Sequence, residues 1–186
     1  MTSRRTFLFT AAPLALFPGS ALAALNACSR DTAMSNDANS VLQDAQVPVQ
    51  KLDRPHREWK PLLSEGAYDV LFNESTERAG SSPLDREKGA GTFICAACYL
   101  PLFESSTKFD SGTGWPSFYQ PIAGHVETKR DFKLIWPRTE YHCARCGGHQ
   151  GHIFDDGPKP TGKRYCNNGI ALRFVQAGET LPALRG

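Results

Sequence analysis

The chain of 186 residues carries 21 lysines and arginines against 19 aspartates and glutamates, and 40% of its residues are hydrophobic. This composition is typical of a globular protein, and the length accommodates one domain with additional segments. The formal net charge of +2 excludes the strongly basic surface that non-specific nucleic-acid binding requires, so we expect no nucleic-acid partner. Residues 1–50 hold only six of the 40 charged residues, and the folded part is therefore expected in the last two-thirds of the chain.

Residues 1–28 have the pattern of an export signal. Arg4 and Arg5 precede an apolar stretch from Phe7 to Leu25, which prolines interrupt. The stretch is too weakly apolar for a membrane-spanning helix, whereas a positive start, an apolar middle and small residues at the end are typical of an export signal. The order Ser-Arg-Arg-Thr-Phe-Leu resembles a bacterial twin-arginine signal, with an ordinary Sec signal or an uncleaved anchor as alternatives. We therefore expect export to the bacterial periplasm.

Cys28 lies at the end of this signal. It follows Leu25-Asn26-Ala27 and resembles the processing site of a lipoprotein, in which case a lipid on Cys28 would tether the protein to a membrane. Ala21-Leu22-Ala23 offers a competing cleavage site, after which Cys28 remains as a thiol, and an ordinary cleavage beyond it would remove it. Residues 29–55 are rich in Ser, Asn, Asp, Ala and Gln without a helical or strand period, which predicts a flexible tether.

Residues 56–176 have the patterns of a folded domain, and residues 177–186 form a tail. The stretch 59–76 is predicted to be helical, with Ser64 as a cap and Tyr68, Leu71 and Phe72 spaced along one face. Beyond it the chain changes to short branched or aromatic runs bounded by Gly, Pro, Asp and Asn, which predict strands at 92–95, 132–136, 152–154 and 170–175. We expect a small, mainly β domain of antiparallel strands with short helices at its start.

Four of the six cysteines form two C-x2-C pairs, Cys95 with Cys98 and Cys143 with Cys146, separated by 44 residues. Each pair can direct two sulfur atoms at one ion from a tight turn, and two pairs complete a tetrahedral site, so we expect one structural zinc per chain. Two disulfides, or a redox-active pair, are the alternatives in an exported protein. A catalytic zinc is not expected, because four thiolates leave no open position.

Cys166 is the remaining cysteine of the domain. Its neighbours are polar, and Lys163 and Arg164 bring positive charge that is expected to lower the pKa of the thiol and favour the thiolate. Upstream, His149 and His152 lie near Asp156. This cluster is either a weak metal-binding motif or a source of acid–base groups for the thiolate.

A glycine-rich loop, residues 108–118, contains Trp115 followed by Pro116. The glycines allow turns, and Pro116 stiffens the chain after Trp115. A tryptophan held in such a loop either fills the core or forms one wall of a small apolar pocket, and the residues alone do not decide between the two.

Together these segments resemble the type B methionine sulfoxide reductases. The resemblance covers about residues 56–176 and rests on six segments in chain order: Cys95/Cys98, 109–118, Cys143/Cys146, 149–154, 156–158 and 164–168. It implies a mainly β fold of two antiparallel sheets and the reduction of methionine-R-sulfoxide in oxidised proteins at the expense of a thiol.

The resemblance also gives each active-site residue a role. It assigns eight side chains to the site: Cys166 as the nucleophile, His152, His149, Asp156, Arg164 and Asn168 as its supporting groups, and Trp115 and Phe154 as the residues that hold the sulfoxide methyl group. Attack at sulfur needs the sulfoxide oxygen to be protonated, for which a nearby imidazolium is suited. An indole face favours the sulfonium-like charge that develops, and the reaction leaves a sulfenic acid on Cys166.

Three positions depart from the family pattern. Asn167 stands where an aliphatic residue is usual and Gly169 where serine is frequent. Thr113 stands where many members carry a resolving cysteine. We therefore expect attack without an internal disulfide, and an external thiol reductant, thioredoxin-like or another, delivered by a dedicated periplasmic system.

Two other functions remain open on the sequence. One is a zinc-containing binding module that recognises methionine sulfoxide without turnover. The other is a zinc-dependent hydrolase that uses His149, His152 and Asp156. The expected assembly state is a monomer.

Overall fold

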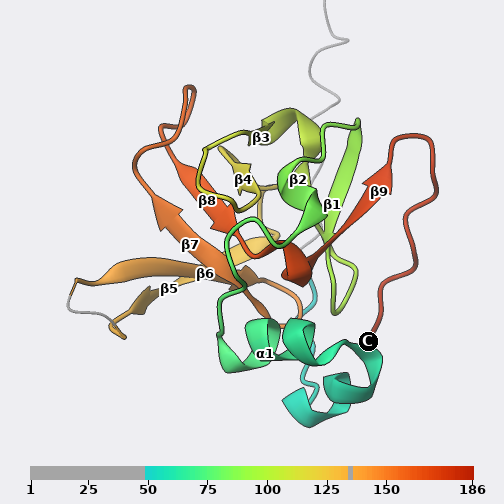
Figure 1. The fold of residues 1–186 in the computed structure, drawn as a ribbon. Helices are drawn as coiled ribbons and strands as arrows, with labels where there is room; N and C mark the ends of the chain where they lie inside the picture. Colours follow the sequence, from blue (N-terminus) through green and yellow to red (C-terminus); the bar gives the residue numbers. More distant parts are fainter. Residues whose placement is uncertain (1–48, 134–135) are drawn as a thin grey trace, which may run out of the picture. The chain divides into compact units, whose positions relative to one another are not determined.

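The computed structural model describes residues 49–133 and 136–186 (Figure 1). The predicted export signal, Cys28 and the tether as far as residue 48 lie outside the described residues. Within the described part, no helix has both the length and the apolar character needed to cross a membrane.

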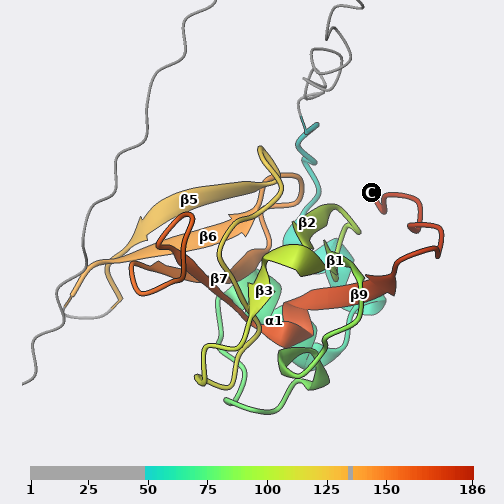
Figure 2. The same cartoon turned by 90° about the horizontal axis from the view of Figure 1, so that it is seen from above.

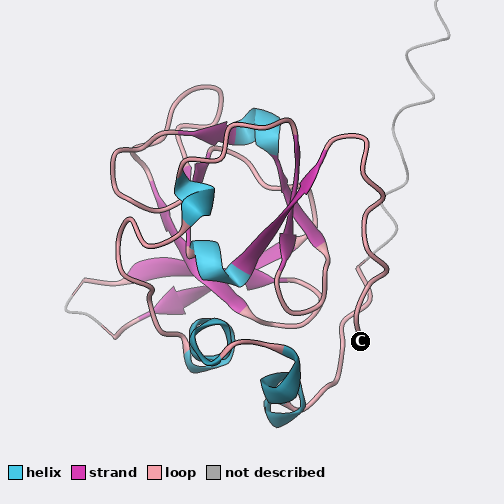
Figure 3. Cartoon of the chain, turned by 45° about the vertical axis from the view of Figure 1, so that its right-hand side comes forward, coloured by secondary structure: helices cyan, strands magenta, loops and turns pink. Residues whose placement is uncertain are grey.

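Two short helices open the described part, where the sequence predicted one helical stretch. They are the 3-10 helix η2 (His56–Leu62) and the α-helix α1 (Glu65–Asn73). Ser64 separates them, because its backbone is extended and its side chain accepts a hydrogen bond from the N–H of Ala67 at 3.3 Å, as expected of an N-cap. Leu71 and Phe72 are buried, which confirms the apolar face of the helix. Both helices lie at one end of the strand-rich body (Figure 3).

Two antiparallel sheets make up the rest of the domain, as predicted. The three-stranded sheet has the order β2 (Pro101–Glu104), β1 (Gly91–Cys95) and β9 (Leu172–Gln176). The six-stranded sheet has the order β3 (Lys108–Phe109), β4 (Ser117–Phe118), β8 (Arg164–Asn167), β7 (His149–Phe154), β6 (Arg138–Cys143) and β5 (Val126–Asp131). Three short 3-10 helices complete the domain: η3 (Pro83–Asp85) between α1 and β1, η4 (Ser105–Thr107) between β2 and β3, and η5 (Gly169–Ala171) between β8 and β9. Figure 2 shows β5, β6 and β7 side by side, away from β1, β2 and β9.

The strand predicted at 132–136 is wrong. β5 ends at Asp131 and β6 begins at Arg138, so the segment belongs to the connection between two strands. Phe132 and Trp136 in this connection are 72% and 80% exposed, and residues 134 and 135 lie outside the described part. A run of apolar residues indicates a strand only where a partner strand and a core cover it, and this run has neither at its described positions.

The core lies between the two sheets. Phe103 of the three-stranded sheet stacks on Phe118 of the six-stranded sheet with 4.1 Å between ring centroids, and Phe93 meets Phe118 edge-on at 4.9 Å. All three rings are fully buried, and each contributes on the order of 2–3 kcal/mol through the apolar surface it removes from water. This packing fixes β4, and with it the neighbouring strand β8.

Segments before and after the predicted domain contact its cysteine turns. The N–H of Leu52 donates to the carbonyl of Arg145 at 2.7 Å, and the N–H of Arg185 donates to the carbonyl of Cys98 at 3.0 Å. The Arg185 guanidinium also lies over the ring of Tyr99, 4.0 Å from its centroid. Parts of the predicted tether and tail therefore pack on the domain, while the division of the chain at residues 56 and 176 stays a prediction.

Strands β7 and β8 approach each other closely at Gly151. A Cβ atom at this position would lie 1.8 Å from the carbonyl oxygen of Cys166. Only glycine leaves room for the two backbones at this distance, and the pairing places His152 directly opposite Cys166.

We predict that Gly151→Ala lowers the free energy of unfolding by about 3 kcal/mol, because the methyl group forces β7 and β8 apart. Denaturant unfolding monitored by tryptophan fluorescence measures the change. Gly66→Ala is the control, since its methyl group would meet only the flexible end of Ile170 at 3.1 Å and alanine favours a helix. A Gly151→Ala protein as stable as the parent would contradict the close approach.

Candidate active site

Cys166 lies in the middle of the six-stranded sheet. On β8 it pairs with Ser117 of β4 on one side and with His152 of β7 on the other. Side chains directly opposite each other in an antiparallel pair share one face, with Cβ atoms about 5 Å apart. The sheet therefore brings a thiol and an imidazole together from separate segments of the sequence.

A pocket of about 130 Å³ opens beside the Cys166 thiol. Its lining contains five of the eight side chains expected in the site: Cys166, His152, Asn168, Trp115 and Phe154. The other three, His149, Asp156 and Arg164, contact lining residues or each other from just outside it. Of the two interpretations of Trp115, the structure supports a pocket wall.

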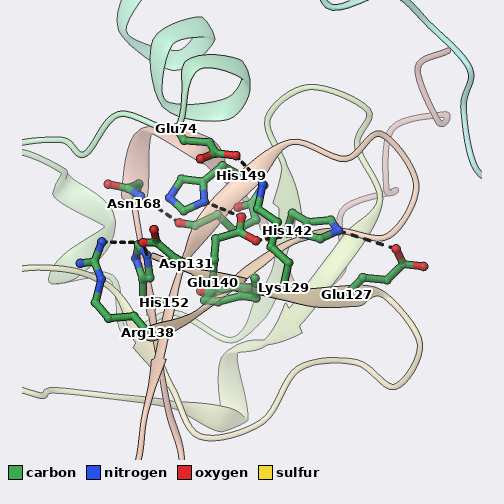
Figure 4. Close-up of polar contacts among 12 residues, drawn as sticks. Glu74, Glu127, Lys129, Asp131, Arg138, Glu140, His142, His149, His152 and Asn168 are labelled. Carbon is green, nitrogen blue, oxygen red and sulfur yellow. Dashed lines mark hydrogen bonds and ion pairs between the residues drawn. The ribbon is translucent and has the colours of Figure 1, made fainter. Parts of the chain in front are cut away.

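The Asp131 carboxylate, which pairs with Arg138, holds His152 by a hydrogen bond (Figure 4). Its Nε2–H donates to Oδ2 of Asp131 at 2.7 Å, and the same oxygen accepts from the Arg138 guanidinium at 2.7 Å. Burial lowers the pKa of His152, while the Asp131 carboxylate opposes the shift and the charge of Arg138 adds to it. The pKa of Asp131 lies well below its ordinary range, chiefly because the N–H of Lys133 donates to it. Nδ1 of His152 forms no hydrogen bond within the described part of the chain.

A second carboxylate holds His149. Its Nδ1–H donates to Oε1 of Glu140 at 2.6 Å, and Oε2 of Glu140 accepts from His142 at 3.0 Å. Burial raises the pKa of Glu140, but the hydrogen bonds from His142 and His149 outweigh it and bring the pKa to about 2. His149 is buried and packs against the His152 ring with 5.4 Å between centroids. Its position behind His152 suits support rather than contact with a ligand.

The charges near Cys166 act differently from the expectation. Burial raises the pKa of the thiol above its ordinary value, and the charge of Arg164 and hydrogen bonds from Thr113 and Arg164 only reduce that rise. Lys163 pairs instead with Asp155 at the surface. The predicted lowering of the thiol pKa is therefore wrong, because a half-buried sulfur loses more hydration than these groups replace.

Arg164 is itself fixed by two contacts. Its Nε and terminal N–H groups donate to the two carboxylate oxygens of Asp156, both at 2.8 Å. The guanidinium also lies over the Phe154 ring, 4.3 Å from the centroid. Asp156 thus acts through Arg164, which holds one wall of the pocket.

Asn168, which lines the pocket, is joined to Glu77 by a hydrogen bond. The Asn168 amide donates to the carbonyl of Gln150 at 3.0 Å and accepts from the N–H of Glu77 at 3.0 Å. The carbonyl of Glu77 accepts from the Trp115 indole at 3.2 Å, and its carboxylate accepts from the N–H of Gly169 at 2.5 Å. Asn168 therefore fixes backbone around the pocket.

The four paired cysteines form a buried cluster that can hold a metal ion, and all their sulfur atoms lie within 4.8 Å of one another. The sulfurs of Cys95 and Cys146 are 3.7 Å apart and those of Cys98 and Cys143 are 3.5 Å apart. A tetrahedron with zinc–sulfur bonds of about 2.3 Å has edges of about 3.8 Å, so the donor set fits zinc. The structure contains neither of the two disulfides considered from the sequence.

The two cysteine turns have the same backbone shape. In each, the N–H four residues after the first cysteine donates to its carbonyl, from Tyr99 to Cys95 at 3.0 Å and from Gly147 to Cys143 at 2.9 Å. Both donors have a positive φ, 64° at Tyr99 and 72° at Gly147. Gly147 adopts this conformation at no steric cost, whereas Tyr99 takes it without that freedom.

Comparison with known proteins agrees with this arrangement. The model of the SelR domain matches residues 63–176, which is more than half of the chain. The chain belongs to the SelR-domain family, the family of the type B peptide methionine sulfoxide reductases.

Three relatives show the extent of the likeness. Peptide methionine sulfoxide reductase B1, chloroplastic, of Arabidopsis thaliana is 53% identical over 118 residues, which are 63% of this chain and 58% of the relative. Peptide methionine sulfoxide reductase MsrB of Pseudomonas putida is 49% identical over 128 residues, which are 68% of this chain and 96% of the relative. MsrB of Methanosarcina barkeri is 49% identical over 131 residues, which are 70% of this chain and 90% of the relative. The chain thus spans between half and two thirds of the plant protein and nearly all of the bacterial one.

Two of the departures from the SelR-domain pattern have a structural setting. A Cβ at Gly169 would lie 2.1 Å from Oγ of Ser82, so the Ser82 side chain occupies the space that a residue at 169 would need. The Thr113 hydroxyl lies 2.8 Å from that of Ser111, which lies 2.8 Å from that of Ser117, the strand neighbour of Cys166. A hydroxyl group therefore stands near Cys166 where a resolving thiol would be needed.

The sequence analysis missed several residues of this SelR-domain site. Asp131, Arg138, Glu140 and Glu77 hold the two histidines, Trp115 and the loop at Gly169. A signal existed for Arg138 and Glu140, since two charged residues spaced by two on a strand share a face. The wrong strand at 132–136 hid it, and no pattern marks Glu77.

We predict that Asp131→Asn lowers the pKa of His152 further. The substitution removes the carboxylate that favours the imidazolium and leaves the positive charge of Arg138 in place. A titration of the His152 ring by NMR measures the shift. Asp155→Asn, which removes an exposed carboxylate bound to Lys163, should leave the titration unchanged. An unchanged or higher pKa in Asp131→Asn would refute the ion pair as the support of His152.

Proposed function

We propose that this chain reduces methionine-R-sulfoxide in oxidised proteins to methionine, with Cys166 as the nucleophile and an external thiol as the reductant. The observation that carries the proposal is the pocket in which the Cys166 thiol faces His152 beside Trp115 and Phe154. The printed names of the relatives, peptide methionine sulfoxide reductases, support the same substrate.

The pocket suggests how each group acts. The sulfoxide methyl group lies between Trp115 and Phe154, and its oxygen points to Nδ1 of His152. The Cys166 sulfur attacks the sulfoxide sulfur while the imidazole delivers a proton to the oxygen. The indole favours the positive charge on sulfur as the S–O bond weakens. The thiol and the sulfoxide become a sulfenic acid and a thioether, so the oxygen passes to Cys166 and no further oxidant is needed.

The resting protonation states follow from the two pKa shifts. Because the pKa of Cys166 is raised and that of His152 is lowered, the pair is a neutral thiol and a neutral imidazole at neutral pH. One proton must therefore move from sulfur to His152 before attack. The Asp131 carboxylate stabilises the imidazolium that this transfer creates.

The hydrolase alternative has little support. One ring nitrogen of His149 and one of His152 are hydrogen-bonded to a carboxylate, and Asp156 accepts hydrogen bonds from Arg164. Among the described residues, the group able to hold a metal is the cysteine cluster, which these side chains do not join. The binding module without turnover remains the alternative that the activity assay decides.

We predict that Cys166→Ser abolishes methionine formation and leaves the fold intact. The assay supplies a peptide methionine-R-sulfoxide with dithiothreitol and measures methionine by mass spectrometry. Tyr165→Phe, a conservative change at the preceding residue of β8, serves as the active control. Activity of Cys166→Ser within tenfold of the parent would refute the nucleophile, and a parent that binds the peptide without turnover would favour the binding module.

A structural zinc, one per chain, is the second part of the proposal. The tetrahedral spacing of the four buried sulfurs supports it. A bound ion would balance the charge of the thiolates and contribute folding free energy where the cysteines at the ends of β1 and β6 come together. Four thiolates leave no position for a substrate, so no catalytic step is assigned to the metal.

We predict one zinc per chain by elemental analysis of freshly purified protein. Cys143→Ser should lower the midpoint of thermal unfolding by roughly 10 °C or more, because a ligand of a folding site is lost. Cys166→Ser serves as the control, since it removes a thiol outside the cluster. Folded, active protein without zinc would overturn this part of the proposal.

Export to the bacterial periplasm is the third part. Its support is the twin-arginine pattern at Arg4 and Arg5 and the lipoprotein-like context of Cys28, both outside the described residues. If Cys28 carries a lipid, residues 29–55 would connect the domain to the membrane. If it does not, they would extend from a freely exported domain. In either case we expect the protein to act as a monomer. The intact mass of the mature protein from a bacterial envelope locates its first residue and detects a lipid; a mass that retains Met1 and lacks a lipid would contradict export by cleavage.

We predict that one turnover leaves a sulfenic acid on Cys166 rather than an intrachain disulfide. Thr113 has no thiol, and zinc would occupy the four paired cysteines, so a separate thiol reductant must restore Cys166. A substoichiometric amount of sulfoxide is added to reduced protein without reductant, and a dimedone-type trap is mapped by peptide mass spectrometry. Finding Cys166 in a disulfide within most chains would contradict the prediction and identify the resolving residue.

A further inference from the structure

A row of buried polar side chains connects the cysteine cluster with strand β8. The Gln150 side-chain amide Nε2–H donates to the sulfur of Cys95 at 3.6 Å, and the Asn167 side-chain amide Nδ2–H donates to Oε1 of Gln150 at 3.2 Å. The Tyr141 hydroxyl donates to Oδ1 of Asn167 at 2.7 Å. All four residues are fully buried.

The bonds fix the orientation of both amides. Gln150 has its N–H group toward sulfur and its oxygen toward Asn167, so rotating the amide by half a turn would lose both bonds. Asn167 donates a second time, to the carbonyl of Asn168 at 2.9 Å. Leaving a polar group unpaired in a buried network costs free energy. A change at one end of the row therefore affects the hydrogen bonds at the other end.

At the metal end, Gln150 contacts a ligand of the proposed zinc. An N–H group that donates to a metal-bound thiolate orients it and reduces its charge, and such outer contacts affect metal retention. Gln150 lies on β7 between His149 and Gly151, so this donor belongs to the strand that also carries the active-site histidines.

At the other end, Asn167 directly follows Cys166. Successive residues of a strand point to opposite faces, so the Asn167 side chain enters the core while the Cys166 side chain faces the pocket. Fixing the Asn167 amide therefore fixes the position of Cys166 along and across the sheet. An aliphatic residue at 167, which the family resemblance leads one to expect, would fill the space without a bond to Gln150.

We propose that Gln150 and Asn167 are positioning residues that couple the metal cluster to the nucleophile. The Gln150 amide holds the Cys95 thiolate, the Asn167 amide holds Cys166, and the bond between them makes metal retention and thiol placement depend on each other. The inference rests on the proposed zinc and on the proposed role of Cys166.

The test measures each substitution at the far end of the row, in the zinc-loaded full chain. Asn167→Leu removes a side chain that forms no hydrogen bond with a sulfur atom among the described residues, and we expect zinc transfer to a chelating dye to be at least fivefold faster. Gln150→Leu removes the contact to Cys95, and we expect the rate of Cys166 alkylation by iodoacetamide at pH 7.5 to change at least threefold. Peptide mass spectrometry reads Cys166 separately from the other thiols.

Two controls separate coupling from general loosening. Tyr165→Phe removes a hydroxyl from the same strand that forms no side-chain hydrogen bond within the described residues, and both rates should stay within 1.5-fold of the parent. Val70→Ala shortens a buried side chain of helix α1 and so destabilises the domain. Thermal unfolding checks that its loss of stability is similar to that of Asn167→Leu and Gln150→Leu. Equal changes of the two rates in Val70→Ala would overturn the proposal.

Unchanged far-end rates also overturn it. If Asn167→Leu folds and releases zinc within twofold of the parent, or Gln150→Leu folds and leaves Cys166 alkylation within 1.5-fold, the two ends are not coupled. Where one variant fails to fold, the other decides, and where both fail, Tyr141→Phe, which removes a hydrogen bond to Asn167, decides by the zinc-transfer criterion used for Asn167→Leu. Neither rate depends on turnover of a sulfoxide. If the protein fails to reduce the sulfoxide but both far-end rates change as expected, the proposed function is refuted while the coupling stands.

Discussion

The pairing of β7 with β8 across Gly151 is the constraint on which the site depends. Because no side chain separates the two backbones there, His152 and Cys166 become direct neighbours on one face of the sheet. The opposite face of the same strands enters the core through Gln150 and Asn167. One strand pair therefore carries the proposed reacting groups on one side and the buried side chains proposed to position them on the other.

Burial sets the electrostatics of this pair. It raises the pKa of Cys166 and lowers that of His152, so both groups rest uncharged, and the Asp131 carboxylate opposes the shift of His152 only in part. Asp131 and Glu140 stay ionised in buried positions because each accepts hydrogen bonds from several donors. The site is thus arranged to create charge during the reaction rather than to hold it beforehand. Arg164, stacked on Phe154 and bound by Asp156, supplies the positive charge that reduces the rise of the Cys166 pKa.

Much of the site could be predicted from residue types and spacing, and the remainder could not for identifiable reasons. The spacing of the two C-x2-C pairs predicts the cluster, because two residues between cysteines fix a local turn shape. Cys166 follows by elimination. Asp131 and Glu77 could not be found this way, since their contacts with His152 and Trp115 span long separations and depend on strand register. The apolar run at 132–136 led to a wrong strand prediction, because local propensity carries no information about whether a partner strand covers the run.

The direction of the thiol pKa shift was also beyond the sequence. Neighbouring charges at 163 and 164 are visible in a sequence, but hydration lost on burial is not, and here the loss outweighs the charges. Lys163 lies just before β8 and pairs with Asp155 at the surface rather than with Cys166.

The central claim is that Cys166 and His152 act as one unit sharing a single proton. The direct measurement is the pH dependence of single-turnover methionine formation at low substrate concentration without reductant, which reports the groups of the free protein. Attack requires a thiolate together with an imidazolium, so the rate should be flat between the two pKa values, fall below that of His152 and fall again above that of Cys166. A rate that rises to the pKa of Cys166 and then stays constant at higher pH would show that the thiolate alone suffices, and would contradict the account.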